Sequence, residues 1–235
     1  MIFGLILAGG KGLRMGKKLP KQYIKIGGRA IISYSAECFV KNEKVDRVII
    51  LVPKNRISYT RELISQDFYK PDKIDIIEGA SLRNDTIIKG IDFVSEHFGI
   101  DDNTFFITHD AARPFVTKEI IDKNIEALKE HNACNTVIPA TDTIISSNDG
   151  KYMDEVPDRS KLYMSQTPQS FRGNIFKKYY LRLGDRERQM LTDATKVFVL
   201  NHENVFMVEG DTKNIKITHS SDLIFAEAII NSGKK

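Results

Sequence analysis

The sequence predicts an α/β fold: a Rossmann-like three-layer domain with a mostly parallel central sheet. Two observations predict it. Short apolar runs alternate with segments of helical spacing from residue 2 to residue 139, and glycine-rich or small-residue stretches follow several of these runs. The 235 residues, 41% hydrophobic and 28% charged, suffice for one domain whose core is stable without metals or disulfides. We therefore expect residues 1–235 to form a single domain that binds ligands at the carboxyl ends of its strands.

The individual elements follow from local patterns. A predicted strand is a short apolar run that ends at glycine, proline or charged residues, and a predicted helix repeats apolar residues every three or four positions, as Ile87, Ile91 and Val94 do. In chain order, we expect strands at residues 2–7, 47–52, 73–77, 104–108, 133–139 and 205–209, and helices at residues 30–40, 56–65, 84–98, 118–131 and 221–230.

Composition excludes several classes of protein. The net charge of +4 is modest and forms no basic block, so it favours anionic small molecules at least as well as nucleic acid, and we expect no nucleic-acid partner. The start of the chain lacks a basic leader region and no apolar stretch has the length of a membrane span, so we expect a cytoplasmic protein without membrane contact. Cys38 and Cys134 fall in a predicted helix and a predicted strand, where buried thiols are expected rather than a disulfide or a zinc site.

A glycine-rich stretch follows the first predicted strand. Gly9, Gly10 and Gly12 let the backbone approach a ligand and adopt positive φ, so that amide groups can face an anion. Arg14 and Lys21 add two cations within reach of the same loop. The stretch therefore predicts a polyphosphate ligand.

Spacing argues against two other interpretations of this stretch. A Walker A loop requires four residues between its glycines and then Lys-Ser or Lys-Thr, whereas five residues separate Gly10 from Gly16, and Lys17 precedes Lys18. A dinucleotide fingerprint, as in a dehydrogenase, would place the bulky Met15 where a small residue is needed. A turn rich in glycine with two solvated basic side chains remains an alternative that composition allows.

Two further loops follow predicted strands. Residues 78–86 are mostly small and lead into a helix, so Asn84, Asp85 and Thr86 are either plain capping residues or ligand contacts. Residues 109–115 place Asp110 at a strand end, where its carboxylate could bind Mg²⁺ together with substrate phosphates or could pair with Arg113. His109 and Arg113 are expected to order this turn rather than to contact substrate.

The pattern changes at residues 140–166. Asp149-Gly150 between alternating apolar residues predicts a β-hairpin inserted into the domain. Such a hairpin has little core of its own, so we expect it to be an arm that contacts a partner, and a second copy of the chain is the commonest partner.

Several of these motifs resemble one enzyme family. Residues 7–15 read Leu-Ala-Gly-Gly-Lys-Gly-Leu-Arg-Met and residues 20–23 read Pro-Lys-Gln-Tyr, which resembles the nucleotide-binding signature of sugar nucleotidyltransferases and, within them, of cytidylyltransferases acting on polyol phosphates. Residues 79–86 are similar to the family segment that holds cytosine and ribose, and residues 109–114 read His-Asp-Ala-Ala-Arg-Pro as in the family. The resemblance extends from residue 3 to about residue 230.

The resemblance implies a reaction, in which CTP and an alditol phosphate give a CDP-alditol and pyrophosphate with Mg²⁺ as cofactor. It implies a homodimer in which the arm completes the neighbour's site. It assigns catalysis to Arg14, Lys21 and Lys216, metal binding to Asp110, and the acceptor phosphate to Thr143, Arg159 and Lys216. It assigns nucleotide binding to Leu7, Ala8, Gly9, Gly10, Gly12, Gly79, Ala80, Ser81, Arg83, Asp85, Thr86, Asp110 and Ala111.

Two branches of the family share these motifs. One uses D-ribitol 5-phosphate and supplies CDP-ribitol for teichoic acid or capsule; the other uses 2-C-methyl-D-erythritol 4-phosphate in isoprenoid synthesis. The methylerythritol branch usually reads Thr-Asp-Glu-Ala-Ser where residues 192–196 here read Thr-Asp-Ala-Thr-Lys, so we expect ribitol phosphate as acceptor, with methylerythritol phosphate as the alternative. A nucleotide-binding protein without catalysis is the second alternative, because a fold does not fix a function.

Overall fold

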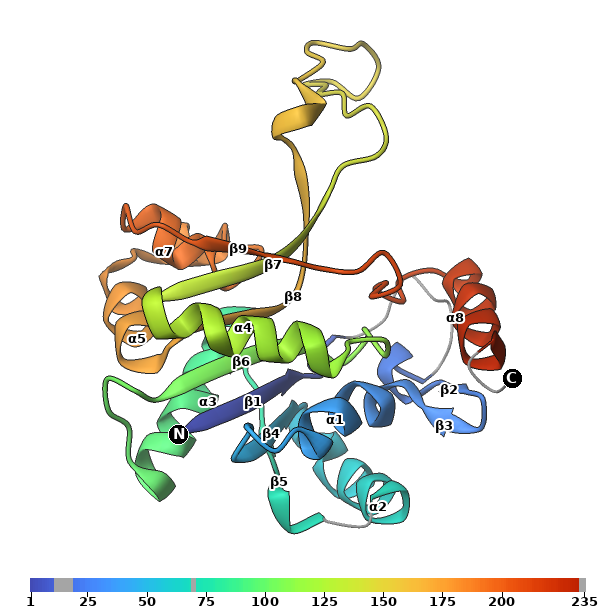
Figure 1. The fold of residues 1–235 in the computed structure, drawn as a ribbon, viewed down its shortest axis with the longest axis vertical. Coiled ribbons are helices and arrows are strands. Elements are labelled where there is room, and N and C mark those ends of the chain that lie inside the picture. The colour runs from blue at the N-terminus through green and yellow to red at the C-terminus, as the bar shows by residue number, and fades with distance from the viewer. Residues whose placement is uncertain (11–18, 69–70, 233–235) are drawn as a thin grey trace.

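A seven-stranded sheet forms the middle layer of the computed structural model, which describes residues 1–10, 19–68 and 71–232 (Figure 1). The strands lie in the order β5-β4-β1-β6-β8-β7-β9, and β8 alone among them runs antiparallel to its neighbours. The strands are β1 (Ile2–Leu7), β4 (Arg47–Val52), β5 (Ile74–Glu78), β6 (Phe105–Asp110), β7 (Ala133–Pro139), β8 (Tyr163–Arg172) and β9 (Phe206–Glu209). The predicted α/β fold with a mostly parallel sheet is confirmed.

Helices cover both faces of this sheet (Figure 1). They are α1 (Ile31–Lys41), α2 (Ile57–Asp67), α3 (Arg83–Phe98), α4 (Lys118–Glu130), α5 (Gly173–Arg182), α6 (Asp185–Gln189), α7 (Lys196–Leu200) and α8 (Ser220–Ser232). The small strands β2 (Lys25–Ile26) and β3 (Arg29–Ala30) form a separate hairpin after a 3₁₀ turn at Lys21–Tyr23. Its turn residues Gly27 and Gly28 both have positive φ, which glycine adopts without strain.

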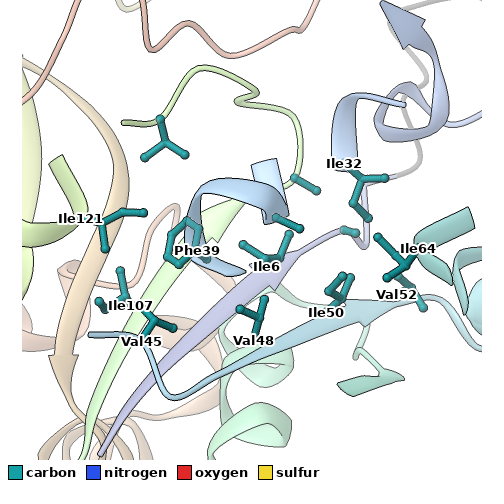
Figure 2. Close-up of a cluster of buried hydrophobic side chains, with 14 of the residues drawn as sticks. Ile6, Ile32, Phe39, Val45, Val48, Ile50, Val52, Ile64, Ile107 and Ile121 are labelled. Atoms are coloured by element: carbon teal, nitrogen blue, oxygen red, sulfur yellow. The ribbon is translucent and has the colours of Figure 1, made fainter. Parts of the chain in front are cut away.

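The core lies on the two faces of the sheet because side chains alternate along each strand. In β4, Val48, Ile50 and Val52 face α1, α2 and α4, as Figure 2 shows, whereas Ile49 and Leu51 face α3, α5 and α7. Burial of one such aliphatic side chain stabilises the fold by about 1.5–3 kcal/mol. Because a shift of one residue would move each apolar side chain to the opposite face, the two clusters favour one register of the strands.

The predicted elements agree with the structure to within about two residues at most boundaries. The expected elements did not include β2, β3, α5 or α6. The elements β2, β3 and α6 are only two to five residues long, whereas α5 does carry apolar residues at helical spacing, with Phe176 and Tyr180 on its buried face. Residues 140–162 extend away from the domain between β7 and β8 as an arm (Figure 1). The arm is less regular than the predicted hairpin, since the one strand bridge described within it joins Ser146 to Glu155.

Two further expectations can be compared with the described part of the chain. Neither cysteine forms a disulfide, and Cys134 is buried in β7 while Cys38 is half-buried in α1. None of the helices in residues 1–10, 19–68 and 71–232 is both long enough and apolar enough to span a bilayer.

Candidate active site

A cavity of about 520 Å³ opens at the carboxyl ends of β1 and β6. Small-molecule sites have volumes of this order and occur at this edge of parallel sheets. The described residues that line it are Leu7, Ala8, Gly9, Gly10, Lys21, Gln22, Ala80, Ser81, Leu82, Arg83, Thr86, Asp110, Ala111, Ala112, Lys216 and Thr218. The cavity thus brings together the loops after β1 and β5, the end of β6 and the segment before α8.

Hydrogen bonds from Gln22 hold the loop after β1. The Gln22 side chain is buried, and its Nε2 donates hydrogen bonds to the carbonyl oxygens of Ala8 at 2.6 Å and Gly10 at 3.2 Å. A Cβ at Gly9 or Gly10 would meet no atom within 4 Å among the described residues, so both glycines face open space. The expectation of positive φ is wrong for Gly9 and Gly10, because neither is among the positive-φ glycines of the described chain. Glycine here leaves room for a ligand rather than relieving a backbone angle.

The loop after β5 is shaped by Thr86. The Thr86 hydroxyl accepts a hydrogen bond from the amide of Ala80 at 2.9 Å and donates to the carbonyl of Leu82 at 2.9 Å. Thr86 therefore closes the loop over the first turn of α3 instead of serving as its N-cap, which is Leu82. Ser81 is exposed in this loop, and Arg83 at the start of α3 pairs with Asp110.

Asp110 lies at the centre of the charged part of the cavity. Its Oδ1 is 3.0 Å from Arg83 Nη2, and its Oδ2 is 2.7 Å from Lys216 Nζ. Burial by itself would raise the pKa of Asp110, but the charges of Arg83 and Lys216 and the hydrogen bond from Lys216 outweigh it and hold the pKa below its usual range. Asp110 is therefore ionised at neutral pH.

His109 and Arg113 support this centre from behind. His109 is fully buried, and its two ring nitrogens lie 2.9 Å from Arg113 O and 2.9 Å from Thr167 Oγ1. Burial lowers the pKa of His109 to about 4, so the imidazole is neutral at physiological pH. Arg113 donates from Nη1 to the carbonyl oxygen of Asn214 at 2.7 Å. Both residues order the turn after β6, as the sequence predicted.

The remaining predicted residues either do not line the cavity or lie outside the described part of the chain. Gly12 and Arg14 lie outside the described residues. Gly79 and Asp85 are not among the described residues that line the cavity; Asp85 instead accepts a hydrogen bond from the Tyr180 hydroxyl at 2.5 Å. Thr143 and Arg159 lie exposed on the arm, where Arg159 Nη1 donates to the carbonyl oxygen of Thr141 at 2.7 Å.

The family model described as IspD, 2-C-methyl-D-erythritol 4-phosphate cytidylyltransferase, matches residues 2–232. The chain belongs to this family. Members are cytidylyltransferases, so the protein is a nucleotidyltransferase that uses CTP.

Solved structures agree with this family in fold. The 4-diphosphocytidyl-2C-methyl-D-erythritol synthase from Anaerococcus prevotii is 28% identical, with 98% of this chain and 96% of that chain covered and a TM-score of 0.80. The 2-C-methyl-D-erythritol 4-phosphate cytidylyltransferase from Francisella tularensis is 24% identical over 97% of this chain and 98% of that chain, with a TM-score of 0.79. The enzyme of the same name from Thermus thermophilus is 22% identical over 98% of this chain and all of that chain (100%), with a TM-score of 0.74.

The cavity of this cytidylyltransferase can hold a polyanion and a hard cation. Lys21, Arg83 and Lys216 supply positive charge, and Asp110 is the carboxylate that lines the cavity among the described residues. No group of three or more metal-ligating side chains occurs within the described ranges. Because Mg²⁺ often binds through one or two carboxylates plus substrate phosphates, Asp110 fits a site shared with a nucleotide rather than a cage made by protein alone.

Sequence reasoning missed several lining residues. Gln22 belongs to the motif at residues 20–23, but the motif does not predict that its buried amide donates to two loop carbonyls. Leu82, Ala112 and Thr218 also line the cavity. The position of Gln22 next to Lys21 in the motif at residues 20–23 was the available signal for it; the other three residues carry no signal of their own.

Proposed function

We propose that the protein transfers the cytidylyl group of CTP to the phosphate of an alditol phosphate, giving a CDP-alditol and pyrophosphate. The observation that carries the proposal is the ionised Asp110 held between Arg83 and Lys216, with Lys21 on the wall of the same cavity. This arrangement can neutralise two polyanions placed against each other, which is the main requirement for phosphoryl transfer.

The chemistry needs no general base. A phosphate monoester is already ionised at pH 7, so one of its oxygens attacks the α-phosphorus of CTP in line while the bond to the bridging oxygen of pyrophosphate breaks. The neutral and fully buried His109 is consistent with this reaction. It is not among the described residues that line the cavity, and the reaction does not require it to take a proton from substrate.

Each charged side chain has a distinct task in this proposal. Arg14 and Lys21 stabilise the charge that develops on the α-phosphate and the leaving pyrophosphate, and Lys216 binds the acceptor phosphate. Asp110 would hold Mg²⁺, which neutralises phosphate charge when bound. The loops at residues 7–12 and 79–86 would hold the nucleotide, with Ala80, Ser81 and Thr86 placed beside the cavity in the described chain.

A second copy of the chain would complete the site. Thr143 and Arg159 stand on the exposed arm, and large apolar residues there are also uncovered, with Tyr152 75% and Met153 67% exposed. Exposed apolar groups on an extended segment favour contact with a partner. We therefore propose a homodimer in which the arm of one copy delivers Thr143 and Arg159 to the acceptor phosphate in the other copy.

The comparisons support 2-C-methyl-D-erythritol 4-phosphate as acceptor better than the ribitol 5-phosphate expected from the sequence. The family model carries that acceptor in its description, as does the product name of the Anaerococcus prevotii relative. We propose methylerythritol phosphate as the first acceptor to test.

Ribitol 5-phosphate was expected because residues 192–196 depart from the usual methylerythritol pattern, and the packing around Ala194 accounts for part of that departure. Ala194 is fully buried in the apolar cluster of α3, α5 and α7, and its amide donates to Gln169 Oε1 at 3.0 Å. A glutamate at this position, as in the usual methylerythritol pattern, would have to bury a carboxylate among apolar side chains, which is costly. The chain therefore departs from that pattern for a structural reason.

Pyrophosphate release from CTP and Mg²⁺ tests the proposal, measured in parallel with each acceptor and with none. Release with methylerythritol phosphate alone supports the first acceptor, and release with ribitol phosphate alone replaces it with the second. Absence of release with both, while CTP still binds in calorimetry, would favour a nucleotide-binding protein without this catalytic activity.

A further inference from the structure

Lys216 lies in a segment without helix or strand. Residues 210–219 connect β9 to α8, yet Lys216 Nζ reaches to 2.7 Å from Asp110 Oδ2. A lysine on an irregular segment keeps such a distance only if its backbone is held by specific contacts. The contacts that hold this segment therefore decide where the ammonium group lies.

Asn214 makes the central contact. It is fully buried two residues before Lys216, and its Nδ2 donates to the carbonyl oxygen of Thr167 at 2.8 Å and to Gln166 Oε1 at 3.2 Å. Both partners are acceptors, which fixes the orientation of the Asn214 amide. Gln166 in turn donates from Nε2 to the carbonyl oxygen of Asp211 at 2.9 Å. The segment is thus fastened to β8 at the point where the arm returns to the sheet.

The backbone around Asn214 is held from the other side by the turn after β6. Arg113 Nη1 donates to the carbonyl oxygen of Asn214 at 2.7 Å, and the amide of Ile217 donates to the carbonyl oxygen of Ala112 at 2.9 Å. Lys216 therefore lies between two fixed points, one at Asn214 and one at Ile217.

Thr167 links the same contact to Asp110. The amide of Asp110 donates to Thr167 Oγ1 at 3.1 Å, while the carbonyl of Thr167 accepts from Asn214. The Arg113 carbonyl can only accept, so His109 donates from Nε2 and its Nδ1 accepts from the Thr167 hydroxyl. One residue of β8 thus aligns the backbones that carry Asp110 and Lys216.

We propose that Asn214 is a positioning residue for the transfer reaction: it sets the Lys216 ammonium against Asp110 by fastening the segment before α8 to Gln166 and Thr167. The inference rests on the proposed function for its kinetic consequence. Its structural consequence, the placement of Lys216, stands independently of which substrate is used.

The kinetic test compares Asn214→Ala and Asn214→Asp with the wild-type protein. A displacement of about 1 Å can cost up to about 100-fold in rate, so we expect kcat to fall by about 10- to 100-fold and KM for the acceptor to rise. KM for CTP should change by less than about 3-fold, because the proposed nucleotide contacts lie in other loops. Equal losses for both substrates, or an unchanged kcat, would contradict the proposal.

Asn124→Ala is the matched control. Asn124 is also fully buried, and its Nδ2 donates two hydrogen bonds, to Ile120 O and Thr136 Oγ1, each 2.9 Å long and away from the cavity. It should lower Tm while leaving kcat of the folded protein near the wild-type value. If Asn124→Ala lowers kcat as much as Asn214→Ala at equal loss of Tm, general destabilisation explains both and the proposal is wrong.

Two further measurements keep the test decisive. In a Lys216→Ala background, Asn214→Ala should lower kcat by less than about 3-fold, because residues that act through one group are not additive. Crystal structures should show the Lys216 ammonium beyond ion-pair distance of Asp110 in Asn214→Ala but not in Asn124→Ala. If Lys216 keeps its place, the proposal fails even when the enzyme acts on another acceptor.

Gln166→Met covers the case in which the Asn214 variants do not fold. Gln166 Oε1 accepts from Asn214 Nδ2 at 3.2 Å and Gln166 Nε2 donates to the carbonyl oxygen of Asp211 at 2.9 Å, so the substitution removes two of the bonds that fasten the segment while Asn214 itself is kept. A displacement of Lys216 from Asp110 is expected, and an unmoved Lys216 in this variant would overturn the proposal.

Discussion

Gln22 Nε2 lies 2.6 Å from the carbonyl oxygen of Ala8, and this hydrogen bond joins the 3₁₀ turn at Lys21–Tyr23 to the end of β1. The bond has a double effect. It satisfies the Ala8 carbonyl with a buried donor, and it holds the turn that carries Lys21, the neighbour of Gln22, on the cavity wall. A buried amide with two carbonyl partners is thus part of how the glycine loop is prepared for an anion.

Gln22→Leu should weaken nucleotide binding. The substitution keeps most of the side-chain volume but leaves two loop carbonyls without their donor, a loss of about 1–3 kcal/mol in a buried setting. We expect KM for CTP to rise by about 10-fold or more, with a smaller change for the acceptor. The exposed Gln189 offers the control Gln189→Leu, and an equal KM for CTP in both variants would contradict this role.

Lys21→Ala should act on turnover rather than on folding. Lys21 lines the cavity and is half-buried, whereas Lys25 on β2 is exposed. By analogy with other preorganised charge-stabilising groups, we expect kcat to fall by about 10² to 10³ in Lys21→Ala and to stay unchanged in Lys25→Ala. Near-normal turnover of Lys21→Ala in a steady-state assay would remove Lys21 from the proposed mechanism.

Asp110→Asn should lower turnover and raise the Mg²⁺ concentration that the reaction requires. The amide is a weaker metal ligand and leaves Arg83 and Lys216 without their shared carboxylate, so turnover should fall by about 10² or more and require higher Mg²⁺. Glu126→Gln is the control: it also removes one negative charge, but from the surface of α4, so the Mg²⁺ dependence should stay as in the wild type. Titration of the rate with Mg²⁺ checks this, and an unchanged Mg²⁺ dependence would argue against Asp110 as the ligand.

The sequence predicted the middle of this sheet well because β1 and β4 are mostly continuous apolar runs with clear ends, and such runs specify buried strands locally. It also placed Asp110 at a strand end. It did not predict that Arg83 and Lys216 share Asp110, because the three residues are distant in sequence and their contact depends on sheet order. The buried contacts of Gln22 and Asn214 were missed for the same reason: a polar residue in a loop gives no local sign of its partners.

Tyr180 should make stability depend on alkaline pH. Burial, followed by the hydrogen bond to Asp85, raises the pKa of Tyr180 above its ordinary value near 10. The folded protein therefore keeps a proton that the unfolded chain loses, so this contribution to stability is complete below about pH 10 and is lost as pH rises further. In urea unfolding, the advantage of wild type over Tyr180→Phe, about 1–3 kcal/mol at pH 8, should shrink toward pH 11. A constant difference would show that the pair does not titrate in this way.

Mixing two inactive variants should restore activity if the arm completes the neighbour's site. Lys216 lines the cavity of its own copy, whereas Arg159 lies exposed on the arm, so Lys216→Ala and Arg159→Ala should each lose most turnover alone. In a mixed dimer, one site combines an intact Lys216 with an intact Arg159 from the other copy. After the two variants are unfolded together and refolded at equal concentration, about a quarter of wild-type activity is expected from random pairing in a two-fold dimer. Mixtures of Lys216→Ala with Lys21→Ala provide the control. Both residues line the cavity of their own copy, so each site of a mixed dimer still lacks one of the two lysines. No recovery in the test mixture would place Arg159 in the site of its own chain or outside the reaction. Recovery in the control would show that Lys21 and Lys216 do not serve the same site, contrary to the proposal.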